Sequence, residues 1–248
     1  MAEIRNFYYS HLVHPGDSIH IKESDFHHIK NVLRLKEGDL IGLLASNGKF
    51  NARIHKIHHL SVEVYLLDKE ERNLSQPSVH LIQALPKGWK MDEIIEKSTE
   101  IGVASILPIY TTRTIPKFSQ QEENNKLVRW NKIAIAASKQ SNRVSIPKIS
   151  TIQTFDAVLK QIDHQEGCKI LFWEMEQNQS LIPIIEAVPE KNYYIIVGPE
   201  GGISIEEKNL ASNHQFTSTS LGENILRTET AAPFSIGLIL YLWKNFYA

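Results

Sequence analysis

The segment Gly-Pro-Glu-Gly-Gly, residues 198–202, places three glycines around a glutamate directly after an apolar run. The run ends at Val197 and is typical of a buried strand, and a capping pattern starts a helix at Ser204, so the segment is a strand-to-helix loop. Glycine lets backbone N–H and C=O groups come close to a ligand, and Pro199 stiffens the turn. A tight structural turn is the alternative, but three glycines around Glu200 favour a ligand-binding loop.

A second loop of the same kind follows about 20 residues later. The polar stretch Arg227-Thr228-Glu229-Thr230 lies between a predicted strand that ends at Leu221 and an apolar helix. Thr228 and Glu229 could simply cap that helix, but a cap does not explain the arginine before them. Two strand-to-helix loops of this type predict one shared ligand pocket.

Two common nucleotide-binding fingerprints and metal-ligand patterns are missing from the sequence. G-x-G-x-x-G and G-x-x-x-x-G-K-[ST] are both absent, which argues against a dehydrogenase and a P-loop nucleotidase. The single cysteine, Cys168, excludes an internal disulfide and argues against a structural zinc site. The histidine pairs at 27–28 and 58–59 lack ligand spacing and would point to opposite faces of a strand. We therefore expect no metal site.

Positive charge is concentrated in residues 108–148, which contain eight Lys or Arg and two Glu residues in a chain whose net charge is −1. Such a segment predicts an anion-binding face, with a solvated helix surface as the alternative. Gln140 and Arg143 end a predicted helix inside it, where polar residues can also act as C-caps. Lys30 and Arg34 are four residues apart on one predicted helical face and could meet phosphates or only solvent.

The elements that must position these residues fall into two groups. Residues 1–72 are typical of short strands with one helix, for which Ser24 or Asp25 is the expected N-cap, and this pattern predicts a small β-barrel. In one of these strands the apolar residues alternate from Val62 to Leu66. A polar linker is expected at 68–78. Residues 75–248 then alternate between strands and helices, which predicts an α/β domain with a mostly parallel sheet. Ligands of such folds bind beyond the carboxyl ends of the strands.

Three helical details can be predicted more closely. Ser204 and Glu207 have the spacing of a capping box. Pro233 in the last helix is tolerable only in the first turn. Gly102 is the expected C-cap of a helix whose inward residues are Ile94, Ile95, Ser98 and Ile101.

Composition is that of a soluble globular protein, with 42 % hydrophobic and 22 % charged residues among 248. The first ten residues show no signal-peptide pattern, and the longest apolar run, 234–243, is half the length needed to span a bilayer. A single cysteine suits a reducing compartment. We therefore expect a cytoplasmic protein without a membrane partner.

Several motifs together resemble one known family. "IIVGPEGGISIEE" at 195–207 is followed by "LGENILRTETA" at 221–231, and "HHIKNVLRLKEGD" occurs at 27–39. Shorter matches are "EKSTEIGV", "RWNKIAIAASKQSNR" and "LFWE". The chain resembles the RsmE family of SPOUT-class ribosomal RNA methyltransferases, from Arg5 almost to its C-terminus.

The resemblance implies a fold, a cofactor and an assembly. The first domain, 1–72, would be a PUA-like β-barrel that binds RNA, and the second, 75–248, a SPOUT methyltransferase domain with a C-terminal trefoil knot. The knot would form the S-adenosylmethionine pocket, and the family is homodimeric. The cofactor-binding positions carried over are Leu171, Phe172, Gly198, Pro199, Glu200, Gly201, Gly202, Leu221, Gly222, Ile225, Leu226, Arg227 and Thr228.

The RNA-binding positions that we carry over or infer from charge are Arg5, Lys30, Arg34, Arg113, Gln140 and Arg143. The sequence departs from the family where relatives usually carry Glu-Gln, because Lys139 precedes Gln140 here. The loop "SNGKF" also lacks the acidic residue commonly found before its glycine.

The implied activity is S-adenosylmethionine-dependent methylation of N3 of a specific uridine in bacterial 16S ribosomal RNA, supplied as RNA or as the assembled small subunit. Uracil N3 must lose its proton near or before attack, so the site needs charge stabilisation or a base. Arg143 and Arg227 are the candidates for the first task, and Glu229 is the candidate base unless it only caps the last helix. The alternatives are a SPOUT methyltransferase for another ribosomal or transfer RNA position, and a non-catalytic RNA-binding assembly protein. Intact glycine loops and Arg227 argue against the last.

Overall fold

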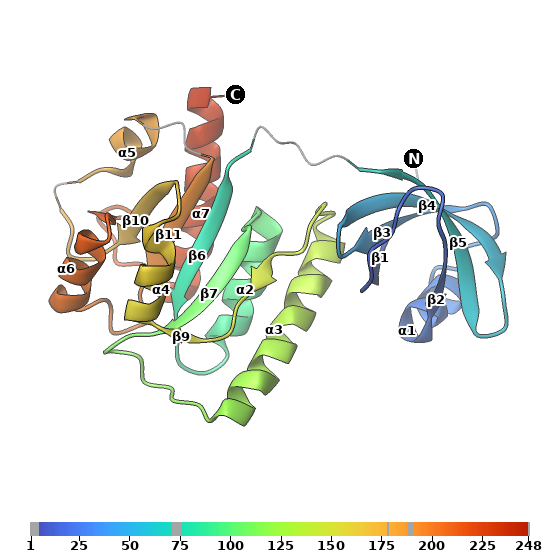
Figure 1. The fold of residues 1–248 in the computed structure, drawn as a ribbon, viewed down its shortest axis with the longest axis horizontal. Coiled ribbons are helices and arrows are strands. Elements are labelled where there is room, and N and C mark those ends of the chain that lie inside the picture. The colour runs from blue at the N-terminus through green and yellow to red at the C-terminus, as the bar shows by residue number, and fades with distance from the viewer. Residues whose placement is uncertain (1–4, 71–75, 178, 188–190, 248) are drawn as a thin grey trace. The chain divides into compact units, whose positions relative to one another are not determined.

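The computed structural model describes residues 5–70, 76–177, 179–187 and 191–247. Contacts divide the chain into two compact units, which Figure 1 colours along the sequence. The first unit contains Met1–Asn73 and Ile135–Ile146, and the second contains Leu74–Ala134 and Pro147–Ala248. Residues 71–75 of the predicted linker lie outside the described residues. The sequence did not indicate that Ile135–Ile146 would group with the first unit.

A five-stranded sheet forms the first unit. Its strands are β1 (Asn6–Tyr9), β2 (Ser18–Lys22), β3 (Leu40–Ala45), β4 (Gly48–Ile57) and β5 (Ser61–Lys69). They are ordered β1-β3-β4-β5-β2, with β1 and β3 parallel and the other pairs antiparallel. The predicted alternation in β5 is confirmed, because Val62, Val64 and Leu66 are all buried in one apolar core.

A short helical segment packs on this sheet. Helix α1 (Glu23–His27) runs directly into one turn of π-helix, η1 (His28–Val32). The N-cap prediction is wrong, because the helix already begins one residue before Ser24. Asp25 has a different role: its carboxylate accepts a hydrogen bond from the Tyr8 N–H at 3.4 Å and lies 3.2 Å from Nζ of Lys139.

The π-helical turn changes which residues face inward. The N–H of Leu33 donates to the carbonyl of His28, five residues back, and Leu33 packs against the core while Val32 is 61 % exposed. Arg34 lies beyond the helix with φ of +53°. The prediction that Lys30 and Arg34 share one helical face is therefore wrong, because α-helical spacing does not continue through this segment.

The segment before Arg143 is fastened to this sheet by polar side chains. Nδ2 of Asn6 donates to the Lys139 carbonyl at 3.1 Å and to Oδ1 of Asn142 at 3.0 Å. The buried Nζ of Lys49 donates to the same Oδ1 at 2.6 Å. Asn142 has φ of +57°, which asparagine tolerates better than most residues. This cluster fixes the backbone next to Arg143.

A seven-stranded parallel sheet forms the second unit. Its strands are β6 (Ser78–Ala84), β7 (Ser105–Tyr110), β8 (Lys148–Ile149), β9 (Gln153–Thr154), β10 (Cys168–Phe172), β11 (Asn192–Val197) and β12 (Thr217–Thr219). The order is β12-β10-β11-β6-β7-β8, with β9 also paired to β7, and each of these pairings is parallel. The predicted α/β class with a mostly parallel sheet is confirmed. Strand β6 lies between β7 and β11, at a point where the strand order reverses, which is where such sheets bind ligands.

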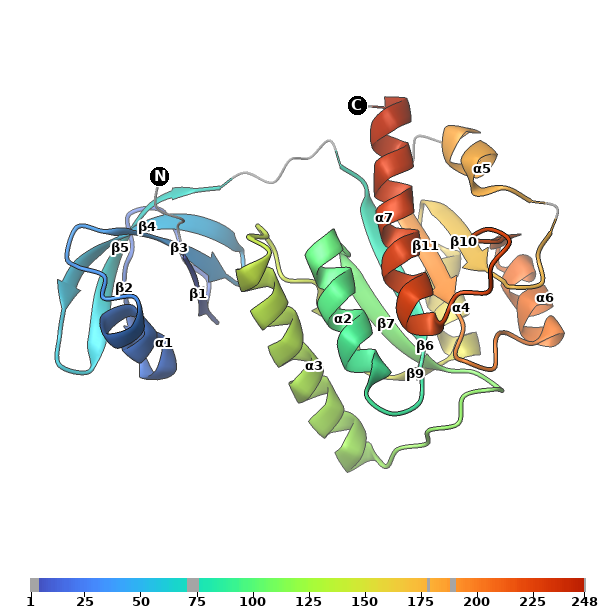
Figure 2. The same cartoon turned by 180° about the vertical axis from the view of Figure 1, so that it is seen from behind.

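Helices cover both faces of this sheet. They are α2 (Lys90–Ile101), α3 (Gln120–Gln140), α4 (Phe155–Asp163), α5 (Leu181–Ala187), α6 (Ile205–Asn213) and α7 (Thr228–Tyr247). Helices α2 and α7 contact each other on the face that Figure 2 turns to the viewer, and α4 and α6 contact each other on the opposite face. The last residues of α3 belong to the first unit.

The helical details were predicted with mixed success. The capping box of Ser204 and Glu207 is present, and Gly102 ends α2 with φ of +128°, so both predictions are confirmed. Ile101 was predicted to face inward but is 40 % exposed, because it is the last residue of α2, where the helix ends. Pro233 is not in the first turn of α7 as predicted, because the helix starts five residues earlier, at Thr228.

Candidate functional site

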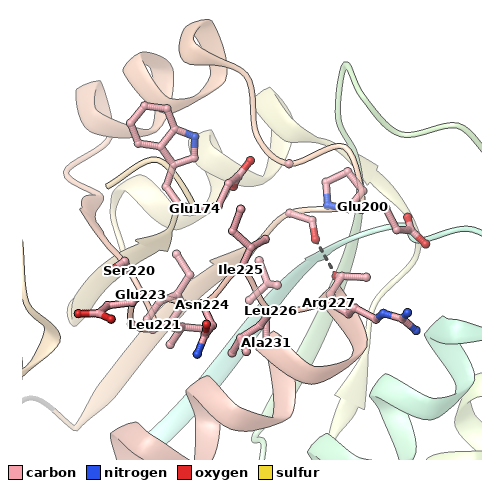
Figure 3. Close-up of a pocket in the computed structure, with 18 of the residues that line it drawn as sticks. Glu174, Glu200, Ser220, Leu221, Glu223, Asn224, Ile225, Leu226, Arg227 and Ala231 are labelled. Carbon is pink, nitrogen blue, oxygen red and sulfur yellow. Dashed lines mark hydrogen bonds between the residues drawn. The ribbon is translucent and has the colours of Figure 1, made fainter. Parts of the chain in front are cut away.

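A pocket of about 580 Å³ opens at the carboxyl ends of the neighbouring strands β12, β10, β11 and β6 (Figure 3). The lining residues are Phe172–Glu174 after β10, Val197–Glu200 and Gly202 after β11, Ser220–Thr228 after β12, and Lys90 and Ala231 on α2 and α7. This is the edge of the sheet at which the sequence placed both ligand-binding loops. The volume lies within the range of roughly 300–1,000 Å³ that small-molecule sites occupy.

The loop at 198–202 needs bare backbone at two of its glycines. Gly202 has φ of +70°, and a Cβ added there would overlap Oε1 of Glu174 and lie 2.8 Å from its Cδ. The N–H of Gly202 donates to the Pro199 carbonyl at 2.9 Å and closes the turn. A Cβ on Gly198 would lie only 3.1 Å from Cγ1 of Ile203. The backbone thus forms part of the pocket wall itself.

Thr228 joins the two loops. Its Oγ1 donates to the Gly198 carbonyl at 2.7 Å (dashed in Figure 3) and accepts a hydrogen bond from Nε2 of Gln83 at 3.0 Å. Thr228 and Gln83 are both buried, so water does not compete for these bonds. They tie the start of α7 to the glycine loop and to β6, which brings the two loops together at one pocket.

A lysine on α2 links the acidic residues of both loops. Nζ of Lys90 lies 2.9 Å from Oε1 of Glu200 and 3.3 Å from Oε2 of Glu229. Burial raises the pKa of Glu200, but the hydrogen bond from Lys90 and the backbone N–H of Lys87 outweigh burial, so this pKa lies below its ordinary value. The hydrogen bond to Glu200 raises the pKa of Lys90 in turn. Lys90 and Glu200 therefore both favour their charged forms, and Lys90 also forms an ion pair with Glu229.

The outer side of the glycine loop is braced by the chain that follows β7. Nη1 of Arg113 donates to the Gly201 carbonyl at 2.8 Å. The N–H of Thr112 donates to Oε1 of Glu207 at 2.7 Å, and the other oxygen of Glu207 accepts from the N–H of Ser204 at 3.1 Å. The capping box thus also holds the β7 loop against the glycine loop.

The cofactor-binding positions predicted from the sequence line this pocket, apart from Leu171 and Gly201. Leu171 is 1 % exposed and packs in the core with residues of α4 and α6. Gly201 faces Arg113, since a Cβ added there would lie 3.2 Å from Cβ of Arg113. Arg227 lines the pocket, and Figure 3 shows its guanidinium extending away from the Ser220–Leu226 loop.

Sequence reasoning missed several lining residues. Trp173 and Glu174 directly follow β10, so their position at a strand end could have identified them. Ser220, Glu223 and Asn224 belong to the second loop but were not singled out. No local signal identifies Lys90, because its place at the pocket depends on β6 pairing with β11.

The predicted RNA-binding residues fall mostly in the first unit. Arg5, Lys30, Arg34, Gln140 and Arg143 all belong to it, whereas Arg113 belongs to the second unit. Lys30, Arg34 and Gln140 are exposed. Lys30 and Arg34 have the charge and access that a phosphate contact requires, and the neutral amide of Gln140 can donate a hydrogen bond.

Comparisons with known proteins identify the family. A profile of an RNA methyltransferase domain matches residues 73–240, and a profile of an RNA methyltransferase PUA domain matches residues 21–65. Ribosomal RNA small subunit methyltransferase E of Bacillus subtilis is 30 % identical over 228 residues, which cover 89 % of both chains. The chain belongs to the ribosomal RNA small subunit methyltransferase E family. The resemblance noted in the sequence is confirmed, and with it a PUA-like domain in the first unit.

Solved structures support this membership of the methyltransferase E family. A ribosomal RNA small subunit methyltransferase E from Neisseria gonorrhoeae, bound to S-adenosylmethionine, is 26 % identical with a TM-score of 0.82, over 97 % of this chain and 98 % of that one. A putative methyltransferase from Legionella pneumophila, also with bound S-adenosylmethionine, is 30 % identical with a TM-score of 0.76, over 96 % and 97 % of the chains.

The described residues were also compared with the patterns of metal sites and of membrane-spanning helices. Within the described parts of the chain, no three His, Cys, Asp or Glu side chains are grouped so that they could hold a metal ion. Among the same residues, none of the helices has the length and apolar character needed to cross a bilayer.

Proposed function

We propose that this protein uses S-adenosylmethionine to methylate N3 of a uridine in the 16S ribosomal RNA of the small subunit. The observation that carries the proposal is the pocket at the carboxyl ends of four strands, where Thr228 joins the glycine loop to the second loop. Relatives from Neisseria and Legionella hold S-adenosylmethionine in structures with the same fold. The family name supports small-subunit ribosomal RNA as the substrate.

The lining residues fit the cofactor in size, charge and polarity. Glu174, Glu200 and Glu223 lie on the wall, and S-adenosylmethionine carries a positive sulfonium and a positive ammonium group. Ile225 is 80 % exposed although it is apolar, so a purine that covered it would remove apolar surface from water. The bare backbone at Gly202 gives room for close approach of backbone groups to the neutral adenine.

When bound, S-adenosylmethionine supplies a methyl group made electrophilic by its sulfonium. The chain must hold the uracil in line with that methyl and accept the N3 proton or stabilise the uracil anion. Arg227 on the pocket wall is suited to stabilising negative charge on O2, O4 or a phosphate. We assign the same task to Arg143, whose backbone is fixed by the Asn142 cluster.

Glu229 remains the candidate base, but its surroundings favour a structural role. Its Oε2 lies 3.3 Å from Nζ of Lys90, and its side chain is only 12 % exposed. An ion pair of this kind fixes the first turn of α7 to α2. To accept the N3 proton, Glu229 would have to break its ion pair with Lys90, which would then pair with Glu200 only. Water at the pocket mouth is therefore the alternative acceptor of that proton.

RNA binding is assigned to the first unit and to the basic residues of the second. Arg5, Lys30 and Arg34 would contact phosphates, which gives affinity that falls as salt rises. Gln140 and Arg143 of the first unit, and Arg113 of the second, are further candidates for RNA contacts. The target base must leave its stack to enter the pocket.

The proposal also covers the barrel and the knot, the homodimer and the cellular location. We assign a closed barrel to the five-stranded sheet and a trefoil knot to the two loops at the pocket. Ile101, Phe234 and Tyr241 are 40 %, 47 % and 66 % exposed on the contacting helices α2 and α7, and a second copy of the chain would bury them as a homodimer. We also propose a cytoplasmic location, because that is where a ribosomal substrate would be met.

The first test is calorimetry of S-adenosylmethionine binding to the full-length protein and to Gly201→Val. A valine there would press on Arg113, whose Cβ would lie 3.2 Å from the added Cβ, and displace the loop. We expect wild-type binding and its loss in the variant, with circular dichroism as the control for folding. Absence of binding by the folded wild type, with or without RNA, would reject the enzyme in favour of the non-catalytic assembly protein.

The second test identifies the product. Small subunits and, in a separate reaction, transfer RNA from cells without the native enzyme are incubated with the protein and labelled cofactor. The modified nucleotide is then mapped by mass spectrometry. We expect one N3-methyluridine in 16S ribosomal RNA. A product in transfer RNA, or at another atom, would leave a methyltransferase but reject the proposed substrate.

A further inference from the structure

The most exposed tryptophan of the second unit lies beside the pocket. The Trp89 side chain is 74 % exposed, whereas Trp130 is 2 % and Trp243 is 9 % exposed. Exposure of so large an apolar ring is unfavourable in water unless a partner covers it. The cofactor itself does not account for it, because Trp89 is not among the residues that line the pocket.

The position of Trp89 on the rim follows from its neighbours. It stands directly before Lys90, which lines the pocket and pairs with Glu200 at 2.9 Å. Two residues earlier, the N–H of Lys87 donates to Glu200 at 3.2 Å. The chain on both sides of Trp89 is therefore fastened to the same carboxylate of the glycine loop, so the backbone of Trp89 lies next to the pocket.

An arginine of α3 orients the ring. Cζ of Arg129 lies 4.8 Å from the centroid of the Trp89 ring, within the range of a cation–π contact. Nε and Nη2 of Arg129 lie 2.9 Å and 2.8 Å from Oδ2 of Asp92, so the guanidinium is itself held in place. The indole thus has a fixed support and still exposes most of its surface, as expected for a preformed stacking surface.

We infer that Trp89 stacks against an unpaired base of the RNA substrate, next to the nucleotide that enters the pocket. This rests on the proposed function, because that function requires a base to be unstacked from its neighbours. An exposed indole replaces the lost stacking for any base, since every base has a π-face. Lys87, two residues before Trp89, is exposed, and the guanidinium of Arg129 lies against the ring although it is paired with Asp92. Cations in these positions suit a phosphate backbone better than an apolar protein surface.

The direct test measures whether RNA reaches the indole. A single-stranded oligouridine is titrated into the full-length protein while tryptophan fluorescence is recorded, with S-adenosylmethionine present. We expect quenching in the wild type that falls markedly in Trp89→Phe, because Trp130 and Trp243 are buried. Trp173 lines the pocket and is partly exposed, but it is present in both proteins and so contributes equally to both signals. Equal quenching in both proteins would overturn the inference.

The second test measures affinity and turnover. Loss of one stacked base should raise the KM for the small-subunit substrate about 5- to 150-fold in Trp89→Ala, and Trp89→Phe should recover most of the loss. S-adenosylmethionine affinity should not change. Val128→Ala is the matched control, because Val128 is an exposed apolar residue beside Arg129 and should leave KM unchanged.

The remaining outcomes separate this inference from its rivals. An unchanged KM in Trp89→Ala would reject the stacking role while leaving the methyltransferase intact. A fall in molecular mass in Trp89→Ala, with fluorescence insensitive to RNA, would assign the indole to a second copy of the chain. Quenching by RNA without methyl transfer by the wild type would keep the stacking surface and reject the proposed activity.

Discussion

Substitution of Gly202 by alanine tests whether the glycine loop needs bare backbone for the pocket or only for its fold. Gly202 has φ of +70°, and an L-residue in the left-handed region costs roughly 1–2 kcal/mol. The added Cβ would also overlap Oε1 of Glu174 and lie 2.8 Å from Cδ, so the carboxylate must move. Glu174 is exposed and its side chain is flexible, so displacement within the pocket mouth is the expected response.

Gly88→Ala is the matched control for the backbone term. Gly88 has φ of +63°, close to that of Gly202, and a Cβ added there has no atom within 4 Å. Both variants should lose roughly 1–2 kcal/mol of stability, a fall in Tm of roughly 2–8 °C for a chain of this size. The cost of the left-handed backbone should be similar in Gly202→Ala and Gly88→Ala. A difference between them in S-adenosylmethionine affinity is then due to the side chain added at the pocket.

The assay is calorimetry of S-adenosylmethionine binding together with thermal unfolding. We expect Gly202→Ala to bind at least about tenfold more weakly, which corresponds to about 1.4 kcal/mol, and Gly88→Ala to bind as the wild type does. Wild-type affinity in Gly202→Ala at a reduced Tm would refute the reasoning, because the loop would then tolerate a side chain at the cofactor. Equal weakening in both variants would assign the effect to general loss of stability.

Three further predictions follow from the same contacts. Folding lowers the pKa of Glu200, so its contribution to stability is present above about pH 4.5 and is lost as pH falls through the lowered pKa; the difference in Tm between wild type and Glu200→Gln should therefore shrink between about pH 7 and pH 3. Arg34→Gly should keep stability within about 1 kcal/mol, because relief of the left-handed φ of +53° offsets the flexibility of glycine, while the salt dependence of RNA binding falls by about one counterion. Arg143→Ala should lose turnover but keep S-adenosylmethionine affinity, and equal loss of both would move Arg143 from chemistry to the structure of the site.

The fold could be predicted from the sequence where the signal was local. Alternation in β5, the capping box at Ser204 and the glycine at the end of α2 each depend on residues close in sequence, and each prediction is confirmed. The predictions failed where tertiary contacts decided. Asp25 did not cap α1, because its carboxylate bonds to the Tyr8 backbone and to Lys139.

The loops of the candidate site could be predicted for the same reason, and their partners could not. Glycine spacing identified residues 198–202, and the polar residues before α7 identified the second loop. Lys90, Gln83 and Arg113 reach these loops only because β6 lies beside β11 and the chain after β7 lies beside the glycine loop. The order of strands in a parallel sheet cannot be predicted from the residue spacing within a single segment.

The loop between β6 and α2 links the cofactor pocket to the rim where we place the RNA. Trp89 is exposed and its successor Lys90 lines the pocket, and Glu200 accepts hydrogen bonds from Lys90 and from the backbone of Lys87. A cofactor that orders the glycine loop therefore also orders the backbone that carries the indole. Because coupling between two ligands is reciprocal, RNA stacked on Trp89 should strengthen S-adenosylmethionine binding by the same factor by which the cofactor strengthens RNA binding.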